Sequence, residues 1–187
     1  MTALARSPEP GGIPEIELTK MRRRHLRKVL SIEARVYPRP WSASLFLSEL
    51  AQRTTRTYLV ARLAAEVAGY AGMMFTGREA HVTNIAVDPM LHGRKIGTRL
   101  LLRLVTEAVA RGVETISLEV RLSNSAAQAM YEKFGFSAVG IRKGYYIETN
   151  EDTIVMVVED ARSTEYRLLL EGLRREVDEL LGEPADG

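Results

Sequence analysis

The feature that most constrains the fold is the stretch from His81 to Leu101, HVTNIAVDPMLHGRKIGTRLL. It begins with the β-branched and apolar residues typical of a strand, passes through a turn and a loop with two glycines, and ends in a leucine-rich helix. The helical spacing of apolar residues continues to Arg111, where Gly112 is a stop signal, and a strand-like run, VETISLEV, follows at 113–120. A strand, a helix and a strand so close together predict a parallel βαβ unit.

The segments on either side of this unit predict further elements. A short strand at 16–18 precedes a helix that has Thr19 as a plausible N-cap and stops before Pro38. A second helix begins after Trp41, with Ser42 as its cap. Further strands are expected at 57–63, 67–75, 80–87, 136–146 and 152–158, with a helix at 124–134 that ends at Gly135 and a turn, TNED, between the last two strands. The order β-α-α-β-β-β-α-β-α-β-β predicts an α/β fold with a mixed sheet around one central parallel unit.

The apolar residues of the first two helices predict which of their faces are buried. In the first helix the buried stripe is expected to comprise Leu26, Val29, Leu30 and Ile32. In the second helix we expect Leu45, Phe46 and Leu50 to face inward.

Composition divides the 187 residues into one domain and two ends. Prolines and paired glycines make residues 1–13 unable to pack a core, so we expect a disordered tail before one folded domain at 14–160. Residues 161–187 should form an amphipathic helix and a tail. This helix would pack on its own domain or on a second subunit in a homodimer, through an apolar seam formed by Tyr166, Leu170, Leu173, Val177 and Leu180.

Charge and residue usage exclude several classes of function. The 26 Lys and Arg residues nearly balance 24 Asp and Glu residues, which is no global footprint for nucleic acid, and we interpret the basic run KMRRRHLRK at 20–28 as the solvated face of a helix. The absence of cysteine excludes a thiol nucleophile, and the three histidines show no metal-binding spacing. No apolar run is long enough for a membrane span, and no signal peptide is recognisable at the start. We therefore expect a cytoplasmic protein without a metal or a membrane partner.

The loop from His92 to Thr98 is suited to hold an anion. A helix N-terminus presents unpaired backbone N–H groups and a partial positive charge. Gly93 and Gly97 allow close approach of the backbone, while Arg94 and Lys95 add full positive charge, so a pyrophosphate is a natural guest. Taken alone, the same composition also suits a plain loop with solvated basic residues, because glycine patterns of this kind are weak fingerprints.

Three separated motifs carry a family resemblance that favours the anion-binding interpretation. These are HVTNIAVDPxxHGRKIGTRLL, SLEVRLSNSAAQAMYEKFGF, and RKGYY followed by an acidic turn and TIVMV. Together they resemble the GCN5-related N-acetyltransferase (GNAT) superfamily and, within it, the RimI-type ribosomal-protein alanine N-acetyltransferases. The similarity covers roughly residues 14–158 and includes YPRPWS at 37–42. It implies a mostly antiparallel sheet whose single parallel unit forms an acetyl-CoA cleft.

The resemblance also implies how the cosubstrate acetyl-CoA is held. Its pantetheine arm would pair with the backbone of Ile85, Ala86 and Val87, and Asn124 would contact it besides capping a helix. The pyrophosphate would lie on the loop formed by His92, Gly93, Arg94, Lys95, Ile96, Gly97 and Thr98. This loop departs from the family pattern, which usually has Gln or Arg at His92 and glycine at Lys95. A lysine still offers its backbone N–H, but unlike glycine it does not freely adopt a positive φ.

Two residues are candidates for the chemistry. Glu119 alternates with apolar residues on the strand ISLEVR, where the pattern alone fits a structural ion pair and the resemblance implies a general base. Tyr131 lies at core spacing in its helix, together with Ala127, Met130 and Phe134. The resemblance implies that its phenol also protonates the departing thiolate as a general acid.

The acceptor is expected to be the N-terminal amine of a protein, by resemblance the alanine N-terminus of a small-subunit ribosomal protein. The pKa of such an amine is about 8, against about 10.4 for lysine, so more of it is neutral at physiological pH. Trp41, Tyr145 and Tyr146 match the substrate side of the resembled enzymes, although the two tyrosines equally fit an aromatic pair at a strand edge. Two alternatives remain open. One is acetylation of a small amine (an amino acid, polyamine or drug), and the other is a non-catalytic domain that binds CoA or scaffolds a partner through its tail.

Overall fold

The structure is a computed structural model that describes residues 15–146 and 151–181. The expected tail at 1–13, the first two residues of the turn TNED (149–150) and the last residues of the chain lie outside the described residues. The strands are β1 (Ile16–Lys20), β2 (Arg56–Leu63), β3 (Glu66–Thr76), β4 (Glu79–Val87), β5 (Thr115–Arg121), β6 (Ser137–Tyr146) and β7 (Glu151–Val158). The helices are α1 (Leu26–Val36), α2 (Ala43–Ala51), α3 (Ile96–Ala110), α4 (Ser125–Lys133) and α5 (Thr164–Leu181), with short 3-10 turns at Arg23–His25 and Pro89–Leu91.

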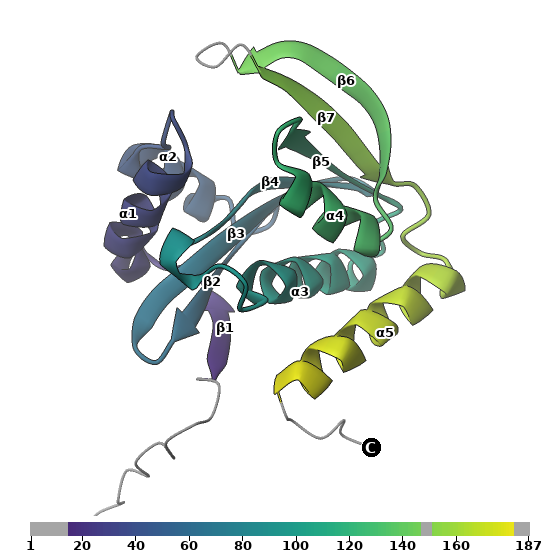
Figure 1. The fold of residues 1–187 in the computed structure, drawn as a ribbon, viewed down its shortest axis with the longest axis horizontal. Coiled ribbons are helices and arrows are strands. Elements are labelled where there is room, and N and C mark those ends of the chain that lie inside the picture. The colour runs from purple at the N-terminus through teal and green to yellow at the C-terminus, as the bar shows by residue number, and fades with distance from the viewer. Residues whose placement is uncertain (1–14, 147–150, 182–187) are drawn as a thin grey trace, which may run out of the picture.

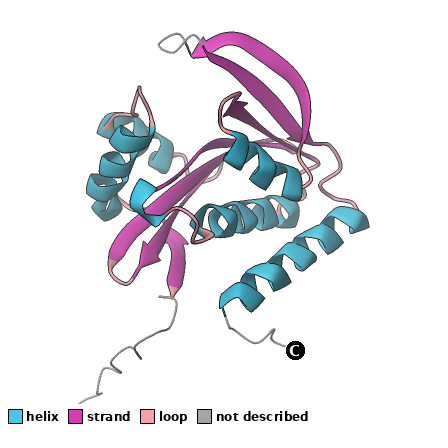
Figure 2. Cartoon of the chain, viewed as in Figure 1, coloured by secondary structure: helices cyan, strands magenta, loops and turns pink. Residues whose placement is uncertain are grey.

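The seven strands form one sheet in the order β1-β2-β3-β4-β5-β7-β6. Its pairs are antiparallel except β4 with β5, which α3 connects. Figure 1 shows α1 and α2 beside one face of the sheet, α3 across the other, and the β6–β7 hairpin arching over one end. The predicted α/β class and element order are confirmed, and Figure 2 shows the helices and strands by colour.

Two apolar cores lie on opposite faces of the sheet because successive strand residues point to opposite sides. In β2, Tyr58 and Val60 join the core beneath α1 and α2, whereas Leu59 and Ala61 join the larger core beneath α3. The larger core includes three residues of α5, namely Tyr166, Leu170 and Leu173. The C-terminal helix therefore packs on its own domain.

The two central parallel strands pair for only part of their length. Residues 79–82 of β4 face residues 115–118 of β5, and beyond them the described strands show no further pairing with each other. A register shift against β3 makes Thr83 an extra residue in β4. Gly72 allows this, because a Cβ there would lie 2.2 Å from the Tyr58 ring and 2.7 Å from the side chains of Thr83 and Asn84. β4 and β5 thus diverge and leave a gap in the middle of the sheet.

Three local predictions hold and two are wrong. The side chain of Ser42 caps α2, Asn124 caps α4, and Gly112 follows α3 with a φ of +77°. Thr19 is not a helix cap, because β1 continues to Lys20 through its antiparallel pairing with β2. Leu45 does not face inward: it is 40% exposed, since Phe46 takes the buried side of this short helix.

The stripe predicted for α1 buries Leu26, Val29 and Ile32. Leu30 is partly buried against the same core, as Leu50 of α2 is. Within residues 15–146 and 151–181, no helix is long and apolar enough to cross a membrane.

Candidate active site

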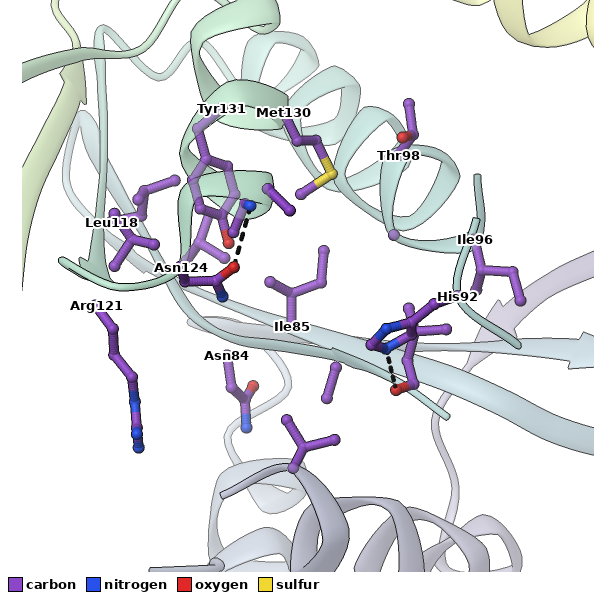
Figure 3. Close-up of a pocket in the computed structure, with 18 of the residues that line it drawn as sticks. Asn84, Ile85, His92, Ile96, Thr98, Leu118, Arg121, Asn124, Met130 and Tyr131 are labelled. Atoms are coloured by element: carbon purple, nitrogen blue, oxygen red, sulfur yellow. Dashed lines mark hydrogen bonds between the residues drawn. The ribbon is translucent and has the colours of Figure 1, made fainter. Parts of the chain in front are cut away.

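A cleft of about 530 Å³ lies where β4 and β5 diverge, a size typical of small-molecule sites. Figure 3 shows side chains from β4, β5, α4 and the start of α3 around it. Its lining brings together most of the residues predicted for the site: Ile85, Ala86, Val87, His92, Gly93, Lys95, Ile96, Gly97, Thr98, Glu119, Asn124 and Tyr131. Arg94 and Trp41 lie outside the described lining.

The backbone of β4 faces this cleft at alternate residues. The Asp88 amide donates to the Ala68 carbonyl in β3, so the backbone groups of Ile85 and Val87 point away from β3. Side chains already contact both carbonyls. The Tyr37 hydroxyl donates to the oxygen of Ile85 at 3.0 Å, and His92 Nε2 donates to that of Val87 at 3.2 Å, the latter drawn in Figure 3.

Lys95 has the conformation that the sequence made doubtful for a lysine. Its φ of +58° and ψ of +17° lie in the left-handed region, where it forms the N-cap of α3, and Gly93 precedes it with a φ of +81°. The loop therefore turns at Lys95 as it would at glycine, although a lysine there is strained by roughly 1–2 kcal/mol. Gly97 lies inside α3, and a Cβ there would make ordinary contacts with Val87 and Met130 at 3.7 Å.

The helix α4 supplies the opposite wall. Asn124 accepts from the Ala127 amide at 3.2 Å, which fixes the start of the helix beside the cleft. Tyr131 is buried, and Figure 3 shows its ring pointing from α4 into the cleft with the hydroxyl toward β4. It packs against Phe136 with ring centroids 6.0 Å apart, so the core position and the orientation toward the cleft are compatible.

Glu119 is held in an ion pair on the β5 wall. Its Oε1 lies 2.7 Å from Nη1 of Arg142 in β6, and the Glu119 side chain is 15% exposed against 59% for Arg142. Burial lowers the pKa of His81 in β4, and Arg142 lowers it further while Glu119 opposes the shift. His81 also shares a 2.9 Å hydrogen bond with Ser117. The structural ion pair considered for Glu119 is thus present, in a residue that also lines the cleft.

The predicted substrate side is resolved only in part. Trp41 is half-buried and packs against Phe46 in a tilted arrangement, with ring centroids 5.3 Å apart. Tyr145 and Tyr146 are the last two residues of β6, and the structure describes only their backbone.

The structure adds a cleft residue that had not been predicted, Glu33 of α1. Its side chain lines the cleft although the residue is only 1% exposed. Burial raises the pKa of Glu33 to about 6, an effect that the hydrogen bond from the Trp41 amide opposes. A signal was present in the sequence, since Glu33 follows Leu26 and Val29 at helical core spacing, where a charged residue is out of place.

Two contacts fix α1 against β4 close to Glu33. Arg35 donates to both carboxylate oxygens of Asp88, at 3.0 and 2.8 Å, and this interaction lowers the pKa of Asp88. The second contact is the hydrogen bond from Tyr37 to Ile85.

A gap between two diverging parallel strands, facing a glycine-containing loop at a helix start, is the arrangement that the resemblance to CoA-dependent acetyltransferases implies. The chain belongs to the acetyltransferase (GNAT) family, whose model matches residues 26–136. It is therefore an N-acetyltransferase, and the family's donor is acetyl-CoA. The resemblance seen in the sequence motifs is confirmed.

Named relatives define the subgroup. The chain is 37% identical over 138 residues to a putative ribosomal protein bS18-alanine N-acetyltransferase of Bacillus subtilis, covering 74% of this chain and 91% of the relative. The bS18-alanine N-acetyltransferase of Salmonella typhimurium is 40% identical over 131 residues, covering 68% and 86%. The crystal structure of the ribosomal-protein-S18-alanine N-acetyltransferase from Escherichia coli superposes with a TM-score of 0.73 at 33% identity, over 81% of this chain and 97% of that one.

Proposed function

We propose that this enzyme transfers the acetyl group of acetyl-CoA to the N-terminal amine of a protein, with the alanine N-terminus of ribosomal protein bS18 as the first candidate. The observation that carries the proposal is the cleft between β4 and β5 in a chain of this family. The acceptor is suggested by the names of the bS18-alanine N-acetyltransferases to which the chain is similar.

The residues of the cleft fit acetyl-CoA. The backbone of Ile85 and Val87 faces the open side of β4 and would pair with the pantetheine arm. The Ile85 carbonyl has a second lone pair beside its bond from Tyr37, whereas the His92 ring would have to leave the Val87 carbonyl. The left-handed turn at Gly93 and Lys95 presents the start of α3, where His92, Arg94, Ile96, Gly97 and Thr98 complete a loop for the pyrophosphate. Asn124 and Ala86 would complete the walls. When bound, acetyl-CoA supplies a thioester carbonyl for attack and a thiolate as leaving group.

The chain's own residues would handle two protons. Glu119 accepts the proton that the amine nitrogen loses as its bond to the acetyl carbon forms, directly or through a water molecule. Tyr131 donates the proton that the sulfur requires as its bond to that carbon breaks. The ion pair with Arg142 holds the Glu119 carboxylate in a fixed position on the β5 wall. Trp41, Tyr145 and Tyr146 would contact the acceptor on the open side.

Mass spectrometry of peptides tests the proposal. The purified enzyme should add 42 Da, the mass of one acetyl group, to a peptide that carries the first residues of bS18 from the same organism. It should not modify the same peptide when the α-amine is blocked and an internal lysine is free. Acetylation of polyamines or free amino acids in place of the peptide would assign the enzyme to small amines. CoA binding without any turnover would contradict catalysis altogether.

A further inference from the structure

Only one of the two carboxylate oxygens of Glu33 has a hydrogen-bond partner among the described residues. Its Oε1 accepts from the Trp41 amide at 2.9 Å, which anchors the loop between α1 and α2. Its Oε2 is buried and has no hydrogen-bond partner among the described residues. Such an atom is costly, because a buried charged group needs compensation for the water it has lost.

A hydrogen-bond donor that would complement the Glu33 oxygen lies on β4, the strand against which α1 is held. Asn84 lines the same cleft, and its Nδ2 is buried without a partner in the part of the chain that the structure describes. Its Oδ1 accepts from the Thr83 hydroxyl at 3.2 Å, so the amide nitrogen is the group left over. Tyr37 lies one turn beyond Glu33 and bonds to Ile85, next to Asn84 in β4. The α1 contacts thus bring Glu33 and Asn84 to the same wall of the cleft.

Loop anchoring alone does not account for this arrangement. A glutamine would accept from the Trp41 amide equally well and would carry no charge. Burial raises the pKa of Glu33 to about 6, so the side chain is still mainly ionised at neutral pH. The folded protein therefore bears the desolvation cost of a buried charge that loop anchoring does not need. Ionisable groups that are buried at such a cost are typical of functional sites.

We propose that Glu33 and Asn84 together recognise the α-aminoacyl group of the acceptor. Glu33 Oε2 accepts a hydrogen bond from the acceptor amine, and Asn84 Nδ2 donates one to the carbonyl oxygen of the same residue. An N-terminal residue has its amine and carbonyl carbon two bonds apart, whereas a lysine side chain or a polyamine has no carbonyl beside its amine. The inference rests on the proposed function and extends it, because it names the chemical group that selects a protein N-terminus.

Binding of two peptides to the enzyme–CoA complex tests the pair without any turnover. One peptide begins with alanine, and the other begins with a lactoyl group, in which a hydroxyl replaces the amine and the carbonyl is kept. Calorimetry on the wild-type enzyme should show at least tenfold tighter binding of the alanyl peptide. Glu33→Gln should reduce this ratio to about twofold or less. Asn84→Ala should weaken both peptides by a similar factor and leave the ratio unchanged.

Two controls separate recognition from damage to the fold. Trp41 is the single tryptophan of the chain, so its fluorescence reports on the loop that Glu33 anchors. The emission should be the same in Glu33→Gln and wild type, since glutamine keeps the acceptor oxygen. Glu107→Gln changes a comparable carboxylate on α3, bonded to Thr57 and Arg111, and should alter neither the peptide ratio nor CoA affinity.

The outcomes distinguish this inference from the proposed function. An unchanged alanyl-to-lactoyl ratio in Glu33→Gln, in an enzyme that acetylates the peptide, overturns the role of Glu33 and leaves the function standing. Unaltered binding of both peptides by Asn84→Ala overturns the role of Asn84. If the wild type neither binds nor acetylates alanyl peptides but acetylates small amines, the proposed function and the inference fail together.

Discussion

At the scale of single residues, the ion pair of Glu119 makes its role separable from stability. Arg142 is 59% exposed, and a pair with one exposed partner contributes at most about 1 kcal/mol. We therefore expect Glu119→Gln to change the melting temperature little. If Glu119 is the base, turnover should fall by roughly 10²- to 10⁴-fold, with acetyl-CoA affinity unchanged.

The matched variant for this prediction is Tyr131→Phe, which deletes only a hydroxyl and keeps the ring packed on Phe136. Its turnover should fall more than its thermal stability. Steady-state rates at saturating acetyl-CoA, together with melting curves, provide both measurements. Near-normal turnover in the two folded variants would remove Glu119 and Tyr131 from the mechanism.

Glu33 makes a prediction about stability and pH. Its folded pKa of about 6 exceeds the usual 4.5, so the folded protein holds this proton more tightly than the unfolded chain. The resulting stability is fully present below pH 4.5 and is lost as the pH rises through 6, a difference of about 2 kcal/mol for about 1.5 pKa units. Glu33→Gln removes this titration. The difference in unfolding free energy, variant minus wild type, should therefore be about 2 kcal/mol more positive at pH 7.5 than at pH 4, which means that the variant gains stability relative to wild type as the pH rises.

Denaturant melts at the two pH values measure the Glu33 effect, with Glu107→Gln as the control. A pH-independent difference between Glu33→Gln and wild type would show that Glu33 does not titrate near pH 6 in the folded protein. The expected combination, a more stable variant with weaker peptide selectivity, is the trade-off typical of residues that serve function at the expense of the fold.

At the scale of elements, the start of α3 is set by one strained residue. Lys95 is left-handed, and glycine adopts this conformation without the Cβ clash. We expect Lys95→Gly to raise the unfolding free energy by up to about 1 kcal/mol, after the entropic cost of glycine in the unfolded chain. In contrast, Arg103→Gly in the exposed interior of α3 should lower it by about 1 kcal/mol. A loss of stability in Lys95→Gly similar to that in Arg103→Gly would contradict the left-handed turn.

Elements with strong local signals could be predicted from the sequence. Asn124 and Ser42 were identifiable as caps and Gly112 as a stop, because each acts through its own backbone neighbourhood. The prediction that Thr19 caps a helix failed because β1 pairs with β2, more than 35 residues away. This pairing extends the strand through Thr19, although the residue would suit a cap locally. Short-range patterns do not register such partners.

The parts of the site that are made of backbone could be predicted from the sequence. The parts that depend on contacts between side chains of different elements could not. The loop at 92–98 and the strand at 85–87 follow from sequence motifs, and most of these residues line the cleft. The partner of Glu119, by contrast, is Arg142 on another strand, and the register that joins them arises only when β5, β7 and β6 assemble. The helical spacing of Glu33 indicated a buried position, but the absence of a hydrogen-bond partner for Oε2 among the described residues can be seen only in the folded cleft.

At the scale of the whole molecule, α5 acts as part of the core. Leu173 is 7% exposed and belongs to the same core as α3, whereas Leu168 on the outer side of the helix is 59% exposed. Leu173→Ala should cost about 2–4 kcal/mol of unfolding free energy, and Leu168→Ala less than about 0.5 kcal/mol. Thermal or denaturant melts compare the two leucines directly. Equal effects would mean that α5 does not pack on the domain as described.

This packing also bears on the expected homodimer. Four residues of the apolar seam, Tyr166, Leu170, Leu173 and Val177, are buried within the chain, and the Tyr166 hydroxyl donates to the Phe134 carbonyl at 3.0 Å. The fifth seam residue, Leu180, is 58% exposed near the end of α5. A dimer through α5 would therefore have to use this end of the seam or the outer side of the helix, where Leu168 is exposed.

The divergence of β4 and β5 has a consequence for how such an enzyme can change over evolutionary time. Because the cleft opens by releasing strand backbone from its pairing, the hydrogen-bonding atoms that it presents are peptide groups, which every amino acid carries. Mutation can replace the side chains around the donor without altering those atoms, provided that the strands still separate after Val82. Donor binding can thus be inherited through long sequence drift, while the acceptor wall, built from side chains such as Glu33 and Asn84, remains free to evolve toward new substrates.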